Sequence, residues 1–158
     1  MTEITTSEAL TPDDVEAVRQ LILEYAAWLG VDLCFQDFDT EMADLAAAYA
    51  PPAGRLYLVR ADGAPAACIG LKPLAVSGEA EIKRLYVRPA CRGHGIARAL
   101  VSRIIEDART AGYRTLRLDT WPPRMPEAEA LYRSFGFSLT PPYYHNPYEG
   151  VVFYALNL

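Results

Sequence analysis

A short glycine-containing turn is the most informative chemical feature of the sequence. It lies between a predicted strand and a predicted amphipathic helix, and it consists of Arg92, Gly93, His94, Gly95, Ile96 and Ala97. Glycine lets the backbone turn sharply and leaves the neighbouring N–H groups unshielded. These donors lie at the positive end of the helix dipole, so the turn predicts a binding site for a pyrophosphate.

Two other phosphate-binding motifs do not fit this turn. A dinucleotide-binding fingerprint needs a third glycine or an alanine at position 98, where the sequence has Arg98. A P-loop needs Gly-Lys-Ser or Gly-Lys-Thr, which the sequence does not contain. The turn therefore indicates a phosphate ligand without indicating either of these two folds.

Cysteine and histidine chemistry is not indicated. The cysteines Cys34, Cys68 and Cys91 form no C-x-x-C pair and are odd in number, so we expect neither a disulfide framework nor a metal site. The two histidines, His94 and His145, suggest no Cys-His or Ser-His-Asp arrangement. A covalent mechanism is therefore not predicted.

The predicted elements place the turn inside a β-helix-β crossover. Helices are predicted at 12–29, 39–48, 94–110 and 126–135, and strands at 55–61, 65–73, 80–88, 113–120, 137–141 and 151–157. A right-handed crossover makes strands 80–88 and 113–120 parallel neighbours, after an antiparallel meander. This order predicts an α/β (α+β) fold, in which a mixed sheet is flanked by helices on both faces.

Two sequence motifs resemble those of the GCN5-related N-acetyltransferase (GNAT) family. The family signature Q/R-x-x-G-x-G/A follows a strand, and here it is met by Arg92, Gly95 and Ala97 within the string AEIKRLYVRPACRGHGIARALV. The later helical pattern A-x-x-L-Y-x-x-x-G-F is met by Ala128, Leu131, Tyr132, Gly136 and Phe137. The resemblance implies a mostly antiparallel sheet of six or seven strands whose parallel central strands splay apart.

The resemblance also implies acetyl-CoA as the co-substrate. Its pantetheine arm would lie between the splayed strands and bind the backbone of Leu85, Tyr86 and Val87, while its phosphates would lie on residues 92–97. One position departs from the family pattern, because an asparagine often found three residues before the helix alanine is Met125 here. A hydrogen bond to the co-substrate is then either missing or supplied by another residue.

Two residues carry the chemistry that the resemblance implies. Glu81 aligns with the general base of several family members, and the alternative is a glutamate that pairs with Lys83 or Arg84 or only helps to hold the acceptor. Tyr132 matches the general acid that protonates the leaving thiolate, and the alternative is a plain core tyrosine. The backbone N–H of Val87 is the candidate oxyanion donor. The other function class that stays open is a non-catalytic acyl-CoA-binding or sensing module.

The charge of the chain is distributed unevenly. Its net charge is −5, but residues 1–53 hold eleven acidic residues and one basic residue, whereas residues 83–124 hold ten basic and three acidic residues. The acidic half and the pI near 5.0 argue against nucleic acid as a partner. Acids beside aromatics at 32–38 and 143–148 favour a cationic acceptor amine, although the same acids serve equally well as helix caps.

The length and the first residues set the expected class of protein. A chain of 158 residues suits one domain, 1–158, and the acidic start of the chain predicts no signal peptide. No apolar stretch approaches the roughly 18 residues that a transmembrane helix needs. We therefore expect a cytoplasmic N-acetyltransferase that acts on a small-molecule or peptide amine, without a membrane partner. Homodimers are common in the family, and the sequence identifies no interface.

Overall fold

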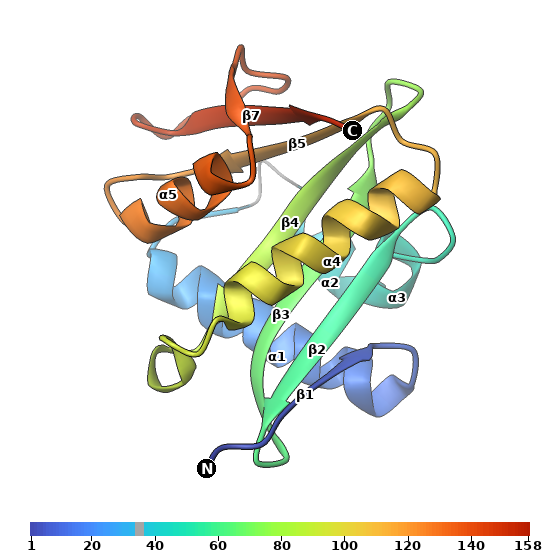
Figure 1. Cartoon of the computed structure of the whole chain (residues 1–158), viewed down its shortest axis with the longest axis vertical. Coiled ribbons are helices and arrows are strands. Elements are labelled where there is room, and N and C mark those ends of the chain that lie inside the picture. The colour runs from blue at the N-terminus through green and yellow to red at the C-terminus, as the bar shows by residue number, and fades with distance from the viewer. Residues whose placement is uncertain (34–36) are drawn as a thin grey trace.

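The computed structural model describes residues 1–33 and 37–158, and within them seven strands form one mixed sheet (Figure 1). The strands are β1 (Ile4–Glu8), β2 (Arg55–Ala61), β3 (Ala64–Pro73), β4 (Glu79–Val87), β5 (Thr115–Thr120), β6 (Ser138–Thr140) and β7 (Val152–Asn157). The helices are α1 (Pro12–Leu29), α2 (Phe38–Ala43), α3 (Leu45–Ala48), α4 (Ile96–Thr110) and α5 (Pro126–Ser134), with a short 3₁₀ turn, η2, at Pro89–Cys91.

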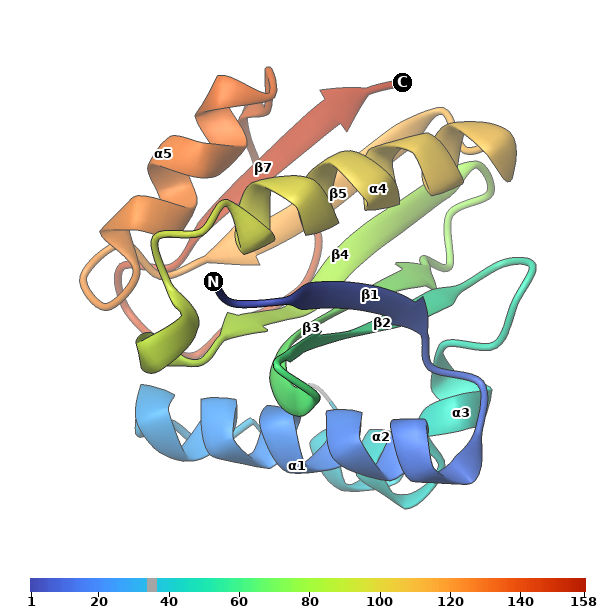
Figure 2. The same cartoon turned by 60° about the horizontal axis from the view of Figure 1, so that its bottom comes forward.

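The strand order is β1-β2-β3-β4-β5-β7-β6, and only the β4–β5 pair is parallel. The helices α1, α2 and α3 cover one face of the sheet, and α4 and α5 cover the other (Figure 2). Both the mixed, mostly antiparallel sheet and its single parallel pair confirm the predicted fold. Among the described residues, no helix is both long enough and apolar enough to span a bilayer.

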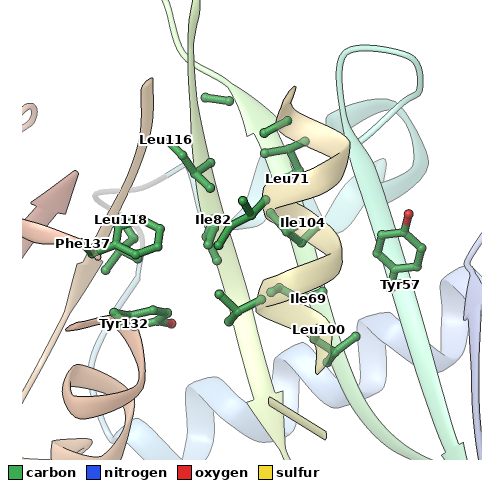
Figure 3. Packing of buried hydrophobic residues seen from close by; sticks show 14 of the residues in the cluster. Tyr57, Ile69, Leu71, Ile82, Leu100, Ile104, Leu116, Leu118, Tyr132 and Phe137 are labelled. Atoms are coloured by element: carbon green, nitrogen blue, oxygen red, sulfur yellow. The ribbon is translucent and has the colours of Figure 1, made fainter. Parts of the chain in front are cut away.

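Each face of the sheet carries its own hydrophobic core. On the α4 face, Leu100 and Ile104 of the helix pack over Ile69 and Leu71 of β3, as Figure 3 shows. The opposite core lies beneath α1 and includes buried leucine and isoleucine side chains of that helix. Side chains alternate between the two faces along a strand, so the central strands must be apolar on both sides. The sheet is therefore a rigid support for the loops at its edges.

Capping residues set the ends of the first helix as predicted. The hydroxyl of Thr11 accepts a hydrogen bond from the N–H of Asp14, with Pro12 in the first turn. Gly30 takes a left-handed conformation and donates its N–H to the carbonyl of Ala26. These local signals fix where α1 ends, and its last turn contributes to the candidate site described below.

The structure corrects the predicted elements in two places. The strand β1 was not predicted, because its sequence ITTSE is polar and its side chains are mostly exposed at the sheet edge. The single helix predicted at 39–48 is two short helices, since Asp44 has φ −144° and ψ 72° and interrupts the helical path. Asp44 instead caps α3 by accepting the N–H of Ala47.

The parallel pair separates soon after it begins. Residues Glu79–Glu81 of β4 pair with Thr115–Arg117 of β5, and no later pairing joins these two strands. Further along β4, Arg84 has φ 60° and the register against β3 shifts between Cys68 and Gly70, which is the mark of a β-bulge. The bulge bends β4 away from β5, so the structure confirms the predicted splay between the central strands.

Candidate functional site

A cavity of about 960 Å³ occupies the region where β4 and β5 diverge. Its walls come from the end of β4, the glycine turn before α4, the end of β5, the first turns of α5 and the last turns of α1. The predicted backbone partners Leu85, Tyr86 and Val87 all line it. Elements that are distant in the sequence therefore meet at the open end of the split sheet.

The edge of β4 turns backbone groups toward this cavity. The N–H of Arg88 donates to the carbonyl of Ala66 in β3 at 2.9 Å. Backbone groups alternate in direction along an antiparallel strand, so the N–H and C=O of Val87 point away from β3 and into the gap. Consistent with this direction, the carbonyl of Val87 accepts a hydrogen bond from Nε of Arg92 at 3.0 Å.

The glycine turn has the predicted shape. Gly93 and Gly95 have φ of 84° and 74°, and a Cβ atom built on either residue meets nothing within 4 Å. Gly95 is the N-cap of α4 and provides no side-chain cap, so the first N–H groups of the helix remain unbonded in the described structure. His94 is exposed and its Nδ1 lies 3.1 Å from the carbonyl oxygen of Cys91. The turn thus presents backbone donors to open space, as an anion site requires.

A buried hydroxyl in the cavity wall lacks a partner. Thr120, at the end of β5, is 4% exposed, and its Oγ1 makes no hydrogen bond within the described structure. Burying an unbonded hydroxyl is costly, so an atom of this kind is expected to be satisfied by a ligand. Free N–H groups at one end of the cavity and this hydroxyl along its wall fit a ligand that carries phosphates and amides, as acetyl-CoA does.

Tyr132 lies in the cavity wall as part of α5. It is 5% exposed and packs edge-to-face against Phe137, with ring centroids 5.9 Å apart (Figure 3). Burial raises the pKa of Tyr132, and the negative charge of Asp119 raises it further. Tyr132 therefore keeps its proton at neutral pH, which leaves a phenol that is able to donate it.

Glu81 lies beside the cavity rather than in its wall. Its carboxylate is 3.5 Å from Nζ of Lys83 and accepts a hydrogen bond of 2.8 Å from the hydroxyl of Tyr143. The pairing with Lys83 matches one of the two alternatives for this residue, whereas Arg84 pairs with Glu41. The role of Glu81 as a general base stays a prediction.

Asp119 is a carboxylate that the sequence motifs did not identify. It lies on β5, lines the cavity, and accepts a hydrogen bond from the hydroxyl of Tyr144. Asp119 and the candidate acid Tyr132 line the same cavity. The sequence contains one signal for it. Asp119 and Arg117 are two residues apart on the strand, so both side chains lie on the same half-exposed face.

Helix α1, on the face of the sheet opposite α4 and α5, forms another wall of the cavity. Tyr25 and Trp28 line it, and the hydroxyl of Tyr25 donates to Sδ of Met125 at 3.6 Å. Met125, which replaces the asparagine common in the family, therefore links the β5–α5 connection to α1. The guanidinium groups of Arg92 and Arg124 both lie over the ring of Trp28.

The expected acceptor region is only partly described. Cys34, Phe35 and Gln36 lie outside the described residues, but Val31 and Leu33 before them line the cavity. Across the cavity, Asn146 and Tyr148 contribute from the loop before β7, and the hydroxyl of Tyr148 accepts the N–H of Asp32 at 2.7 Å. This aromatic loop therefore walls the cavity rather than only covering an edge of the sheet.

Among the described residues, the carboxylates that line the cavity are Asp119 and Glu127, and the acidic side chains at 32 and 37 do not line it. Five basic side chains of the described residues line it: Lys83, Arg84, Arg92, Arg98 and Arg124. In the part of the chain that the structure describes, no group of three or more His, Cys, Asp or Glu residues could hold a metal ion.

Comparison with known proteins gives the class to which this fold and site belong. The family model described as "Acetyltransferase (GNAT) family" matches residues 16–137, and the chain belongs to this family. An uncharacterised N-acetyltransferase of Schizosaccharomyces pombe is 39% identical over 156 residues, which cover 98% of this chain and 95% of the yeast protein.

Solved structures show the same fold. A GNAT acetyltransferase from Staphylococcus aureus superposes with a TM-score of 0.80 at 18% identity, covering 98% of this chain and 99% of that chain. A putative acetyltransferase from Salmonella typhimurium, determined with its cofactor acetyl-CoA, superposes with a TM-score of 0.71 at 21% identity. The match covers 98% of this chain and 93% of the Salmonella chain.

Proposed function

We propose that this protein is an acetyl-CoA-dependent N-acetyltransferase that transfers an acetyl group directly to a primary amine while both substrates are bound. The observation that carries the proposal is the single cavity that joins the bare glycine turn before α4 to Tyr132 and Asp119. Membership of the GNAT family supports it, as does the Salmonella relative of the same fold that was determined with acetyl-CoA.

The co-substrate would be held mainly by backbone groups. The N–H groups of residues 93–97 would bind its phosphates, with Arg92 and Arg98 adding positive charge. The exposed edge of β4 at Leu85 and Val87 would bind the pantetheine amides, and Tyr86 lines the same wall. Thr120 would supply a hydrogen bond where the family asparagine is replaced by Met125.

The chemistry can be assigned to groups of this chain. When bound, acetyl-CoA supplies a thioester, and the reaction forms the N–C bond of an amide and breaks the C–S bond. Asp119 accepts a proton from the acceptor ammonium, and Tyr132 donates one to the leaving sulfur. The N–H of Val87 stabilises the charge that develops on the carbonyl oxygen. Over the whole reaction the ammonium loses two protons, of which one ends on the thiol and one leaves to solvent.

In this scheme Glu81 acts through its neighbours. Its carboxylate fixes the hydroxyl of Tyr143, whose ring packs edge-to-face on Tyr144 with centroids 5.3 Å apart. Tyr144 in turn donates its hydrogen bond to Asp119. We therefore propose that Glu81 positions the aromatic loop and that Asp119 is the proton acceptor.

Calorimetry with acetyl-CoA tests the proposed site most directly. We expect Gly95→Glu to weaken acetyl-CoA binding by at least about tenfold, or 1.4 kcal/mol, because it places a negative side chain in the turn. Gly112→Glu is the matched control, since Gly112 lies at the other end of α4 with φ 88° and equally open surroundings. Equal binding by both variants, or no binding by the wild type, would refute the site.

Release of CoA thiol in the presence of amines then distinguishes an enzyme from a binding module. We expect amine-dependent release by the wild type and its loss in Asp119→Asn. A protein that binds acetyl-CoA tightly but transfers the acetyl group to no amine would be the non-catalytic module instead.

A further inference from the structure

Two guanidinium groups flank one indole ring at the end of α1. Cζ of Arg124 lies 4.6 Å from the centroid of the Trp28 ring, and Cζ of Arg92 lies 5.4 Å from it. Nη2 of Arg124 also donates to the carbonyl oxygen of Trp28 at 2.7 Å. Like charges held at the same ring repel each other, and an anion bound close by would relieve this repulsion.

No carboxylate of the described residues lies within ion-pair distance of Arg92 or Arg124. Two other basic side chains of the cavity are paired, because Lys83 lies 3.5 Å from Glu81 and Arg84 lies 2.9 Å from Glu41. The guanidinium groups beside Trp28 therefore differ from these two in having no ion-pair partner among the described residues.

The two guanidinium groups come from different segments of the chain. Arg92 is part of the glycine turn that leads into α4, and Arg98 follows in the first turn of that helix, so both are placed for phosphate groups. Arg124 comes instead from the β5–α5 connection and is anchored to the main chain of α1. Helix α1 lies on the face of the sheet opposite α4 (Figure 2). Arg124 thus lies outside the glycine turn that would bind the co-substrate phosphates, which leaves it available for another anionic group.

We propose that Arg124, oriented by Trp28, binds an anionic group of the acceptor, most simply a carboxylate. The acceptor would then be a primary amine that also carries a carboxylate, such as an amino acid, with its ammonium group directed to Asp119. This inference rests on the proposed acetyltransferase function. It differs from the cationic acceptor that the acidic residues of the sequence suggested, because those acids do not line the cavity.

Matched pairs of amines test the inference. Initial rates of CoA release are measured with β-alanine and the standard L-amino acids, each compared with its primary amide, and with spermidine as a cationic amine. We expect kcat/KM to be higher for the carboxylate than for its amide with the preferred acceptor. Arg124→Gln should lower kcat/KM for that carboxylate about 10- to 100-fold, as for loss of a charge-assisted hydrogen bond, and leave the amide nearly unchanged.

Arg109→Gln is the control variant, because Arg109 is exposed on α4 and pairs only with Glu106 among the described residues. Calorimetry with acetyl-CoA is run on all three proteins. Unchanged acetyl-CoA affinity together with loss of the carboxylate preference in Arg124→Gln supports the inference. Weakened acetyl-CoA binding in Arg124→Gln would assign the anion to the co-substrate phosphate and overturn it.

Transfer only to spermidine or to amides, or to no member of the panel, would also overturn the inference. In those cases, normal acetyl-CoA binding by the wild type leaves the proposed co-substrate site intact. Absence of acetyl-CoA binding would instead refute the proposed function itself, so the two failures are distinguishable.

Discussion

At the scale of single residues, Tyr132 joins a buried ring to a protonated hydroxyl at the cavity surface. Replacing Tyr132 by phenylalanine keeps the packing against Phe137 and removes only the hydroxyl. We expect kcat to fall about 100-fold, a typical contribution of general acid catalysis, with acetyl-CoA affinity nearly unchanged. Steady-state kinetics and calorimetry measure the two effects. Tyr113→Phe, remote from the cavity, should leave kcat unaltered, and an unaltered kcat in Tyr132→Phe would reject the assignment.

The two candidate proton acceptors, Asp119 and Glu81, have different surroundings and should respond differently to neutral substitution. Asp119 lines the cavity, whereas Glu81 is held between Lys83 and Tyr143. We expect Asp119→Asn to lower kcat about 100-fold or more because the proton acceptor is lost. Glu81→Gln keeps an oxygen that accepts the hydrogen bond from Tyr143, so its kcat should fall less than tenfold. The reverse order of effects would return the role of general base to Glu81.

At the scale of elements, a buried ion pair ties the β4 bulge to α2. Arg84, in the left-handed region at the bulge, donates from Nε to Glu41 at 2.9 Å, and the Glu41 side chain is 1% exposed. The hydroxyl of Tyr49 donates a second hydrogen bond to Glu41 at 2.9 Å. Removing one partner of such a pair leaves a buried charge uncompensated. Glu41→Gln should therefore cost about 3–5 kcal/mol in urea unfolding, whereas the exposed Glu106→Gln should cost little.

The same pair predicts how stability depends on pH. Burial raises the pKa of the Glu41 carboxyl, but the hydrogen bonds and charge of Arg84 outweigh burial and hold its pKa below the ordinary value of 4.5. Because the pKa is lower in the folded than in the unfolded chain, this stabilisation is present above about pH 4.5 and is lost as the pH falls through the folded-state pKa. The difference in unfolding free energy between wild type and Glu41→Gln should shrink below that pH. A constant difference from pH 3 to pH 7 would contradict this account.

Elements with strong local signals were predictable from the sequence. The Thr11 cap, the stripe of α4 and the left-handed Gly95 are each determined by residues within one or two helical turns. The strand β1 was missed because its polar side chains carry no alternating pattern, and its pairing with β2 is a long-range contact. The break at Asp44 divides a segment whose composition is helical throughout.

The residues of the candidate site also fall into two groups, those that local sequence motifs identify and those that only the tertiary structure brings together. The glycine turn and Tyr132 belong to local motifs and were found in the sequence. Asp119, Trp28 and Arg124 meet only because the splayed strands and α1 converge on one cavity. Their spacing along the chain carries no sign of that meeting, so only the tertiary structure identifies them.

At the scale of the whole molecule, the sheet is continuous at one end of the β4–β5 junction and open at the other. The closed end is held by three register pairs and by the two-pronged ion pair between Arg117 and Glu79, with both N–O distances 2.9 Å. A ligand that fills the open end binds only the folded chain. At one hundred times its Kd, acetyl-CoA should add about 2.7 kcal/mol to the unfolding free energy and raise Tm by about 5–10 °C. A thermal melt without such a shift would contradict binding in the gap.

Amide hydrogen exchange tests whether acetyl-CoA binds to the open edge of β4. The N–H of Val87 points into the gap and has no partner within the described structure, whereas the N–H of its neighbour Arg88 donates to Ala66 in β3. Without ligand, the amide of Val87 should therefore exchange much faster than that of Arg88. Saturating acetyl-CoA should slow exchange at Val87 strongly and change Arg88 little, so that adjacent residues serve as site and control. Equal protection of the two amides in the free protein would show that the strand edge is already bonded, and the gap could not then bind the pantetheine arm as we propose.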